Sequence, residues 1–312
     1  MKSACRPINK TTKQLNHTKV EEPLLNGLLT APGATRGILE KYGIHAKKKF
    51  GQNFLINAAI VDGIIEAAGI TKEDCVLEIG PGIGTMSQRL SQEAGRLICV
   101  EIDESLRPIL NDTLEGYDNI TILWQDILKT DICRLVDEYN EGRPLKVVAN
   151  LPYYVTTPIL MKLLEMKGCF ESITVMVQKE VADRIRAQAG TKDYGAISLA
   201  VQYYAEPEVV LEVPPHCFMP RPNVDSSVLH LKAYTEPPVR CDEPFMFALI
   251  RASFNQRRKT LSNGLTHGLH YEGRTLTREE VTQALDKMGL PSAVRGEKLT
   301  LEQFAELSEL LK

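Results

Sequence analysis

The sequence lacks any long apolar run, because no stretch approaches the roughly 18 consecutive apolar residues that a membrane-spanning helix requires. It also lacks an apolar segment near Met1 of the kind that directs secretion. The seven cysteines include no CxxC pair, and scattered cysteines within apolar runs are typical of buried thiols in a reducing compartment. We therefore expect a cytoplasmic protein with no membrane association.

An excess of charge of one sign is also missing. The chain has 37 Lys+Arg against 40 Asp+Glu, for a net charge of −3, so its overall charge does not steer it to nucleic acid, and any polyanion site must be a local basic patch. With 43% hydrophobic and 25% charged residues, the composition is that of an ordinary globular protein and excludes a mostly disordered chain, a coiled coil or a fibrous repeat. The length of 312 residues predicts about two domains.

The N-terminal segment differs from the rest of the chain. It shows no sustained apolar period, and several basic residues precede the first acid, Glu21. Transit peptides are also poor in acids, but this segment holds few arginines, so a plain disordered tail is the favoured interpretation. We expect residues 1–35 to form a flexible extension.

Residues 36–239 alternate between strand and helix patterns. The helical spacing at 57–68 is followed by short apolar runs, which we predict to be strands, at 75–79, 97–102, 120–123, 146–149 and 173–177. Such alternation predicts an α/β fold with a mostly parallel sheet covered on both faces. The segments 209–213 and 224–231 predict an antiparallel hairpin at the edge of the sheet.

Residues 240–312 carry no further strand signal. Thr277 with Glu280 and Thr300 with Gln303 have the spacing of capping boxes that open helices. The segment 301–311 is amphipathic. We therefore expect a small, all-helical C-terminal domain.

A glycine-rich loop follows the first predicted strand of the sheet. Gly80, Gly82 and Gly84 form a GxGxG pattern, with Thr85 where a dinucleotide-binding loop has its third glycine. The loop lies where ligands usually bind in such sheets, and its departure from GxGxxG favours a ligand without a diphosphate. Taken alone, a tight structural turn explains such a loop about as often as a cofactor site.

Two acids lie at the ends of the next two strands. Glu101 lies 21 positions after Gly80, where a carboxylate can accept both ribose hydroxyls. Asp126 follows the third strand and could accept from an adenine amino group. Each is alone an unremarkable solvated acid, but the loop and Glu101 together favour a nucleoside cofactor.

The segment Asn150-Leu-Pro-Tyr153 ends the fourth predicted strand of the sheet. The Asn150 side-chain oxygen and a backbone carbonyl beside Pro152 can accept the two N–H bonds of an exocyclic amine. Pro152 stiffens the turn, and Tyr153 offers a face for stacking a planar base. The alternative is an ordinary Asn–Pro turn, but the position beside the glycine loop argues against it.

Five segments together resemble the KsgA/RsmA family of small-subunit rRNA adenine N6-dimethyltransferases over residues 36–312. They are residues 50–55, 78–84, 150–153, 218–226 and the basic stretch 253–261, which we interpret as a helix. The resemblance implies a Rossmann-like methyltransferase domain, a small helical domain that binds RNA, and S-adenosyl-L-methionine (SAM) as cofactor. It implies methylation of two adjacent adenosines near the 3′ end of small-subunit (16S) rRNA during ribosome biogenesis.

The resemblance also assigns residues to the site. The implied cofactor contacts are Gln52, Asn53, Leu55, Gly80, Gly82, Glu101, Asp126 and Asn150. Asn150 and Pro152 face the target amine, while Tyr153 and Phe218 hold the flipped adenine. No catalytic base is required, because SAM already carries its leaving group and the protein mainly positions the reactants.

A flipped base also requires a surface that binds the surrounding RNA. The candidate contacts are Lys47, Lys48, Lys49, Arg251, Arg257, Arg258 and Lys259. A single charge run is usually a solvated face, but two runs in a chain with a base-flipping motif favour RNA binding. Because the whole chain is acidic, we expect a preassembled small ribosomal subunit as partner rather than naked RNA or DNA.

Other interpretations remain open at this point. An Erm-type methyltransferase of large-subunit (23S) rRNA would share the fold and similar motifs. An assembly factor whose binding outweighs its catalysis is a second alternative, and an NAD oxidoreductase is the weakest.

His267 and His270 are spaced like weak metal ligands, but a surface helix or turn explains them better, so we expect no metal site. We expect a monomer.

Overall fold

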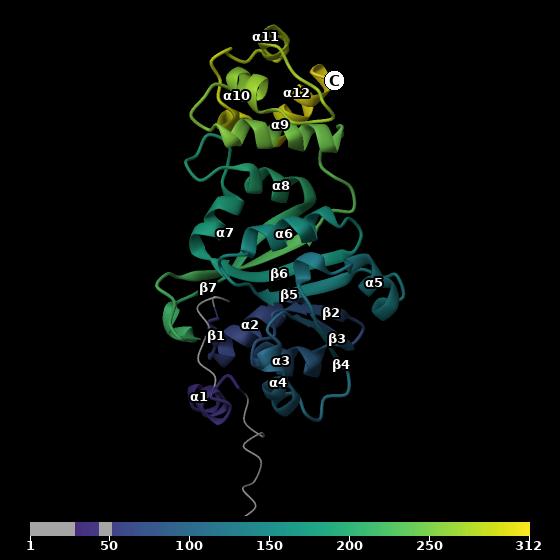
Figure 1. Ribbon diagram of the computed structural model, residues 1–312, viewed down its shortest axis with the longest axis vertical. Helices are drawn as coiled ribbons and strands as arrows, with labels where there is room; N and C mark the ends of the chain where they lie inside the picture. The colour runs from purple at the N-terminus through teal and green to yellow at the C-terminus, as the bar shows by residue number, and fades with distance from the viewer. Residues whose placement is uncertain (1–28, 44–51) are drawn as a thin grey trace, which may run out of the picture.

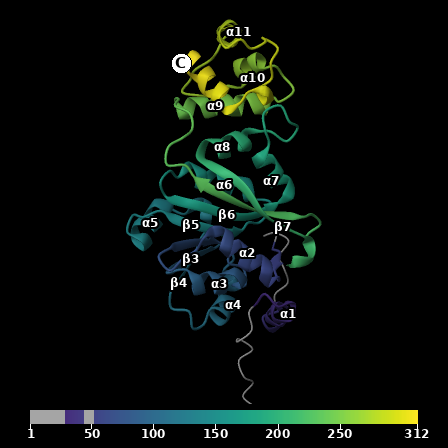
Figure 2. The same ribbon diagram turned by 180° about the vertical axis from the view of Figure 1, so that it is seen from behind.

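The computed structural model describes residues 29–43 and 52–312. They form a twisted sheet with helices on both faces, and a group of helices stacked beyond one of these faces (Figure 1). In Figure 2 the same stacking is seen from behind, with α9–α12 separated from the sheet by α6, α7 and α8. The predicted α/β class with a helical C-terminal part is confirmed.

The large sheet has seven strands in the order β4-β3-β2-β5-β6-β9-β7. Its strands are β2 (Cys75–Ile79), β3 (Arg96–Glu101), β4 (Ile120–Trp124), β5 (Leu145–Asn150), β6 (Phe170–Gln178), β7 (Ala205–Val213) and β9 (Ser226–Ala233). The five strands β2 to β6 are parallel, and β9 pairs antiparallel with both β6 and β7. The antiparallel edge predicted from the sequence is therefore present: β7 is the edge strand, and β9 lies between β7 and β6. A separate two-stranded ribbon pairs β1 (Phe54–Leu55) with β8 (Phe218–Met219).

The sheet is buried on both faces because its strands are apolar at consecutive positions. In β2, Leu77 packs with α5 and α6 on one face, whereas Val76 packs with α2 and α3 on the other. Both side chains are completely buried. This is the expected pattern for parallel strands covered by helices on two sides.

Several helices begin at residues whose side chains cap them. Those around the sheet are α1 (Pro32–Lys41), α2 (Ala58–Ala68), α3 (Thr85–Glu93), α4 (Arg107–Thr113), α5 (Ile132–Asn140), α6 (Thr156–Glu165), α7 (Lys179–Arg186) and α8 (Ala196–Tyr204). The C-terminal ones are α9 (Glu243–Asn255), α10 (Leu261–Gly268), α11 (Arg278–Lys287) and α12 (Leu301–Leu310). The predicted capping boxes are confirmed, because Thr277 and Thr300 cap α11 and α12 with reciprocal bonds from Glu280 and Gln303.

Helix α8 belongs to two apolar cores. Its residues Ile197 and Val201 pack with the sheet, while Leu199 and Tyr203 pack with α9–α12. Glu243, at the start of α9, accepts hydrogen bonds from Tyr204 (2.7 Å) and Tyr203 (2.9 Å) and forms an ion pair with Lys167. The sheet and helices α9–α12 are therefore joined by apolar and polar contacts through α8, in addition to the chain segment that connects β9 to α9.

The end of the predicted flexible extension is folded. Leu29 and Thr35 are 2% and 0% exposed, and Thr35 Oγ1 donates to the carbonyl of Leu29. Helix α1 is held to α4 through Lys41 and Tyr42, which both bond to Asp112. The expectation for residues 29–35 was therefore wrong, because Leu29 and Ile38 join a small apolar cluster with α4.

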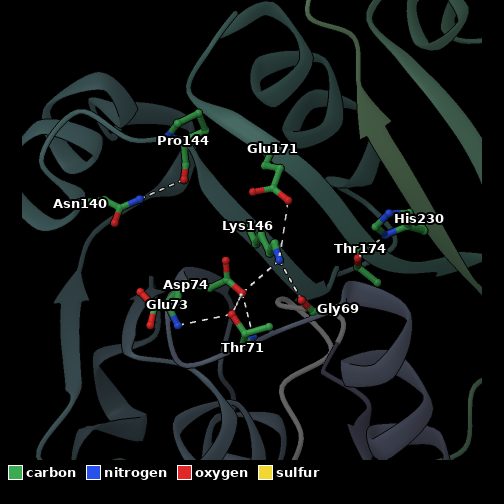
Figure 3. Close-up of polar contacts among 10 residues, drawn as sticks. All are labelled: Gly69, Thr71, Glu73, Asp74, Asn140, Pro144, Lys146, Glu171, Thr174 and His230. Atoms are coloured by element: carbon green, nitrogen blue, oxygen red, sulfur yellow. Dashed lines mark hydrogen bonds and ion pairs between the residues drawn. The ribbon is translucent and has the colours of Figure 1, made fainter.

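The edge of the sheet at which the parallel strands begin is held together by a largely buried lysine, Lys146. Lys146 Nζ donates to the carbonyl of Gly69 (2.8 Å) and to Asp74 (3.0 Å), and lies 3.7 Å from a carboxylate oxygen of Glu171 (Figure 3). Burial alone would raise the pKa of Asp74, but hydrogen bonds from Lys146 and Thr71 hold that pKa below its usual value. This network links β5, β6 and the turn before β2.

In the part of the chain that the structure describes, no helix is long and apolar enough to cross a membrane.

Replacing Lys146 should test the strength of this network. We expect Lys146→Met to lower the free energy of unfolding by about 1–3 kcal/mol at pH 7, because Asp74 loses a partner while remaining largely buried. The loss should begin to shrink as pH falls below about 4, where Asp74 of the unfolded chain becomes protonated, and should fade further once the pH is below the lowered pKa of Asp74 in the folded protein. Urea unfolding at several pH values measures it. Arg134→Met is the control, since its ion pair with Glu138 is exposed and should contribute under about 1 kcal/mol; equal losses would contradict the prediction.

Candidate active site

A cavity of about 300 Å³ lies where strands β2, β3, β4 and β5 end. Its lining includes the loop after β2, Glu101 at the end of β3, Asp126 after β4, and the turn after β5. A cavity of this size is at the lower end of the range for small-molecule sites. It occupies the edge at which ligands bind in open α/β sheets.

The register of the sheet aligns the residues that enter the cavity. Ile79 on β2 pairs with Val100 on β3 and with Ala149 on β5. The next residue on each strand is Gly80, Glu101 or Asn150, so these three reach the carboxyl edge at the same level. The sequence predicted their common edge, and the pairing confirms it.

The glycine loop requires its glycines for backbone reasons. Gly80 and Gly82 have φ of +70° and +60°, in the left-handed region that side chains disfavour. A Cβ at Gly80 would meet nothing within 4 Å, whereas one at Gly82 would lie 3.4 Å from the ring of Phe54. The backbone at Gly80 therefore borders open space in the cavity.

Glu101 is held rigidly at the cavity wall. Its carboxylate accepts from the backbone N–H of Asp103 at 2.8 Å and of Gly82 at 3.4 Å. Burial raises the pKa of Glu101, and these backbone donors oppose the rise. A carboxylate fixed in this way can accept hydroxyl groups of a ligand without having to reorganise.

Two buried polar atoms in the cavity wall have no hydrogen-bond partner among the described residues. They are Oε1 of Glu78 and Oγ1 of Thr85. The other oxygen of Glu78 accepts from Ser87 (2.6 Å) and, more weakly, from Cys99 (3.4 Å). Because unpaired buried polar atoms are costly, these two fit a ligand that brings donors, and a cationic ligand above all.

Asp126 and Gln52 also line the cavity, and both side chains are half-buried. Asp126 Oδ1 accepts from the N–H of Leu128 at 2.9 Å, which leaves its other oxygen for a ligand. Gln52 Nε2 donates to Asp103 at 3.2 Å, so the start of the segment 52–55 is tied to the turn after β3. Leu55 also lines the cavity, although its side chain is only 3% exposed.

The amide of Asn150 is oriented by a backbone carbonyl. Its Nδ2 donates to the carbonyl of Asn53 at 3.1 Å, so Oδ1 is the atom that remains to accept from a ligand. Asn53 is itself positioned by the β1–β8 ribbon, which begins at the next residue. The structure thus brings together three segments that are far apart in the sequence.

The hydrogen bonds within the turn after Asn150 show which backbone carbonyl beside Pro152 can accept from a ligand. The Pro152 carbonyl already accepts from Val155 N and Thr156 Oγ1, both at 3.1 Å. The other carbonyl beside Pro152 is that of Leu151, which also lines the cavity. The Tyr153 hydroxyl lies 2.8 Å from Ser226 Oγ, which holds this ring against the end of the 218–226 segment.

Phe218 lies elsewhere. Its side chain is 2% exposed and packs in the apolar core with Leu55 and Val61, and it does not line the cavity. On the short β8 strand, the side chain of Phe218 faces that core, opposite Leu55 in the register. The implied contact between Phe218 and a flipped base is therefore not supported by this geometry.

The predicted RNA-binding cations are only partly accessible. Lys47, Lys48 and Lys49 lie outside the described residues. The expected basic helix over 253–261 is wrong, because α9 ends at Asn255 and α10 starts at Leu261. Arg257 donates to Glu297 (2.8 Å) and to the carbonyl of Lys192, so it joins the helical part to the 188–193 turn. Arg251, Arg258 and Lys259 are exposed.

Several lining residues were missed from the sequence. Glu78 and Thr85 lie inside segments that were recognised, but nothing in the sequence showed that their polar atoms would be unpaired. Ile102, Leu128 and Tyr154 also line the cavity and are exposed apolar side chains. Their positions next to predicted site residues were the only available signal.

Glu78 should make stability depend on pH. Burial, with a smaller contribution from Glu101, raises the pKa of Glu78 to about 7, so the folded protein binds its proton more tightly than the unfolded chain does. Stability should therefore fall as pH rises from about 4.5 through 7, by about 2–3 kcal/mol from this group. Urea unfolding of Glu78→Gln and of the wild type between pH 5 and 8 measures this, and the variant should gain in relative stability as pH rises. Parallel curves would exclude this assignment.

Comparisons with known proteins agree with the geometry. A model of the family described as "Ribosomal RNA adenine dimethylase" matches residues 43–312. The chain is 55% identical over 282 residues to a ribosomal RNA small subunit methyltransferase A of Lachnoclostridium phytofermentans, covering 90% of this chain and 96% of that protein. It is 47% identical to the protein of the same name from Listeria innocua, covering 91% and 96%.

Solved structures are similar as well. A dimethyladenosine transferase from Plasmodium falciparum has 25% identity and a TM-score of 0.67, covering 81% of this chain and 95% of that one. The 23S rRNA methyltransferase ErmE has 27% identity and a TM-score of 0.61, covering 83% and 99%. With the family match extending over nearly all of the described residues, the chain belongs to the ribosomal RNA adenine dimethylase family.

Proposed function

We propose that this protein transfers methyl groups from SAM to the N6 amines of two adjacent adenosines near the 3′ end of small-subunit rRNA. The observation that carries the proposal is the orientation of Asn150. The side-chain nitrogen of Asn150 donates to the Asn53 carbonyl. The side-chain oxygen is therefore the atom that Asn150 offers to the cavity, and recognition of an amine requires such an acceptor. The relatives named small subunit methyltransferase A support the choice of the small subunit.

The cavity residues fit SAM. Glu101 would accept from its ribose hydroxyls, and Asp126 from its adenine amino group. Glu78 Oε1 and Thr85 Oγ1 would supply the polar wall for its charged end, which accounts for their lack of partners within the described residues. Bound there, SAM supplies an electrophilic methyl group.

The target amine requires orientation rather than a base. Asn150 Oδ1 and the Leu151 carbonyl would accept its two N–H bonds and direct the nitrogen lone pair toward the methyl group. Asn53 holds the Asn150 amide, and Val155 and Thr156 hold the turn, so little reorganisation is needed. After transfer the nitrogen is cationic, and its proton is lost to water without help from a histidine or cysteine.

The target base must leave its stack to reach these acceptors. Unstacking costs a few kcal/mol, and stacking on the Tyr153 ring would recover about 1–3 kcal/mol. The hydrogen bond between the hydroxyl groups of Tyr153 and Ser226 fixes that ring before RNA arrives. Exposed cations of the helical part, Arg251, Arg258 and Lys259, would contact phosphates around the target.

The alternative of a large-subunit enzyme is less well supported. ErmE is 27% identical to the chain, whereas the small-subunit relative from Lachnoclostridium phytofermentans is 55% identical. A role in monitoring subunit assembly is compatible with the same particle-binding surface and need not require catalysis.

Asn150→Ala tests the amine acceptor. We expect the single-turnover rate on unmethylated small-subunit particles to fall by about a hundredfold or more, because an acceptor placed for the reacting group is lost. Asn140→Ala is the matched control, since Asn140 also donates to backbone carbonyls, at 2.8 and 2.9 Å, but near the opposite edge of the sheet (Figure 3). A rate for Asn150→Ala within a few fold of wild type would exclude this mechanism.

Arg258→Glu combined with Lys259→Glu tests the RNA surface. Particle affinity should fall and its log–log dependence on salt should become shallower by about one unit per lost phosphate contact, while SAM affinity stays unchanged. Arg257 is left intact because it stabilises the contact with Glu297. Arg134→Glu with Arg143→Glu gives the same charge change on exposed residues of α5 and the turn after it. If both double variants bind alike, Arg258 and Lys259 do not contact RNA.

A further inference from the structure

The exposed large apolar side chains of the described residues are concentrated at the cavity. They are Ile102, Leu128, Tyr154, Val224, Tyr234 and Leu310. Single exposed apolar residues are ordinary on a protein surface, but three of these six, Ile102, Leu128 and Tyr154, line the same cavity. A gathering of this kind at a cavity is typical of a binding surface.

Two of the three lie at the cofactor end. Ile102 follows Glu101 directly, and Leu128 donates its N–H to Asp126. Both are therefore placed to cover the nucleoside half of SAM. Tyr154 lies instead beside Pro152 and Tyr153, at the end assigned to the target amine, and at 62% exposure it is the most exposed of the six.

Tyr154 differs from its neighbour Tyr153 in a way that suits a second role. The Tyr153 hydroxyl is held by Ser226, whereas Tyr154 forms no hydrogen bond or ring contact within residues 29–43 and 52–312. The backbone below Tyr154 is nevertheless fixed, because Val155 N and Thr156 Oγ1 both donate to the Pro152 carbonyl. The turn therefore presents a free aromatic face from a rigid support.

We propose that Tyr154 stacks on the nucleotide next to the target adenosine and so helps to select an RNA in which that neighbour is also unpaired. This inference depends on the proposed function. When one nucleotide leaves its stack, its neighbour loses a stacking partner, and an aromatic side chain at the mouth can replace it. In a pair of adjacent adenosines, the one that is not the target is the next nucleotide along the chain, so its base can reach Tyr154.

Three variants test the proposal with purified particles that lack the methylation. Tyr154→Ala should raise the KM for the particle about tenfold, since base–aromatic stacking is of that order, and should leave kcat at saturation and the Kd for SAM within twofold. Tyr154→Phe keeps the ring and should behave as wild type. Tyr234→Ala, at an exposed tyrosine that does not line the cavity, is the matched control and should leave the KM unchanged.

A spectroscopic readout separates stacking from a structural effect. Particles reconstituted with 2-aminopurine next to the target adenosine should show quenching on binding the wild type and Tyr154→Phe, and much less with Tyr154→Ala. An unchanged KM with equal quenching would overturn the role of Tyr154, as would a weakened SAM affinity, which would assign the ring to the cofactor. Absence of methyl transfer by the wild type would overturn the proposed function itself, and this inference with it.

Discussion

The parallel register of β2, β3 and β5 is the constraint on which the site depends. It places the ends of three strands at one level, so that a loop of glycines, a carboxylate and an amide face a common space. None of these groups is chemically unusual. Their alignment results from ladder hydrogen bonds and from apolar side chains that fix each strand on both faces. A shift of one residue in any of the three strands would turn its ligand group toward the helices.

Buried polar atoms show what this alignment costs the protein in the absence of a ligand. Among residues 29–43 and 52–312, one carboxylate oxygen of Glu78 in β2 and the hydroxyl of Thr85 at the start of α3 have no hydrogen-bond partner. A core selected for stability alone would place apolar residues at such positions. Together with the raised pKa of Glu101, these atoms concentrate unfavourable desolvation at one wall of the cavity, where a cationic ligand can offset it.

The sequence predicted most strands, both capping boxes and the shared edge of Gly80, Glu101, Asp126 and Asn150, because these follow from local periodicity and from general rules for parallel sheets. It did not predict features that depend on contacts distant in the sequence. The orientation of the Asn150 amide depends on Asn53, and the capture of Arg257 depends on Glu297. The folding of residues 29–35 depends on contacts with α3 and α4, and the burial of Phe218 depends on its pairing with Leu55.

Helix α8 has a consequence for the modularity of this chain. A boundary near residue 240 separates the chain where its secondary-structure pattern changes, yet Leu199 and Tyr203 on α8 belong to the same core as α9–α12. A fragment ending at that boundary would expose one face of α8 to water. Recombination between relatives at this point would join two surfaces that had not been selected together. The two parts are therefore expected to be inherited and exchanged as a single unit, with α8 as the element that both must match.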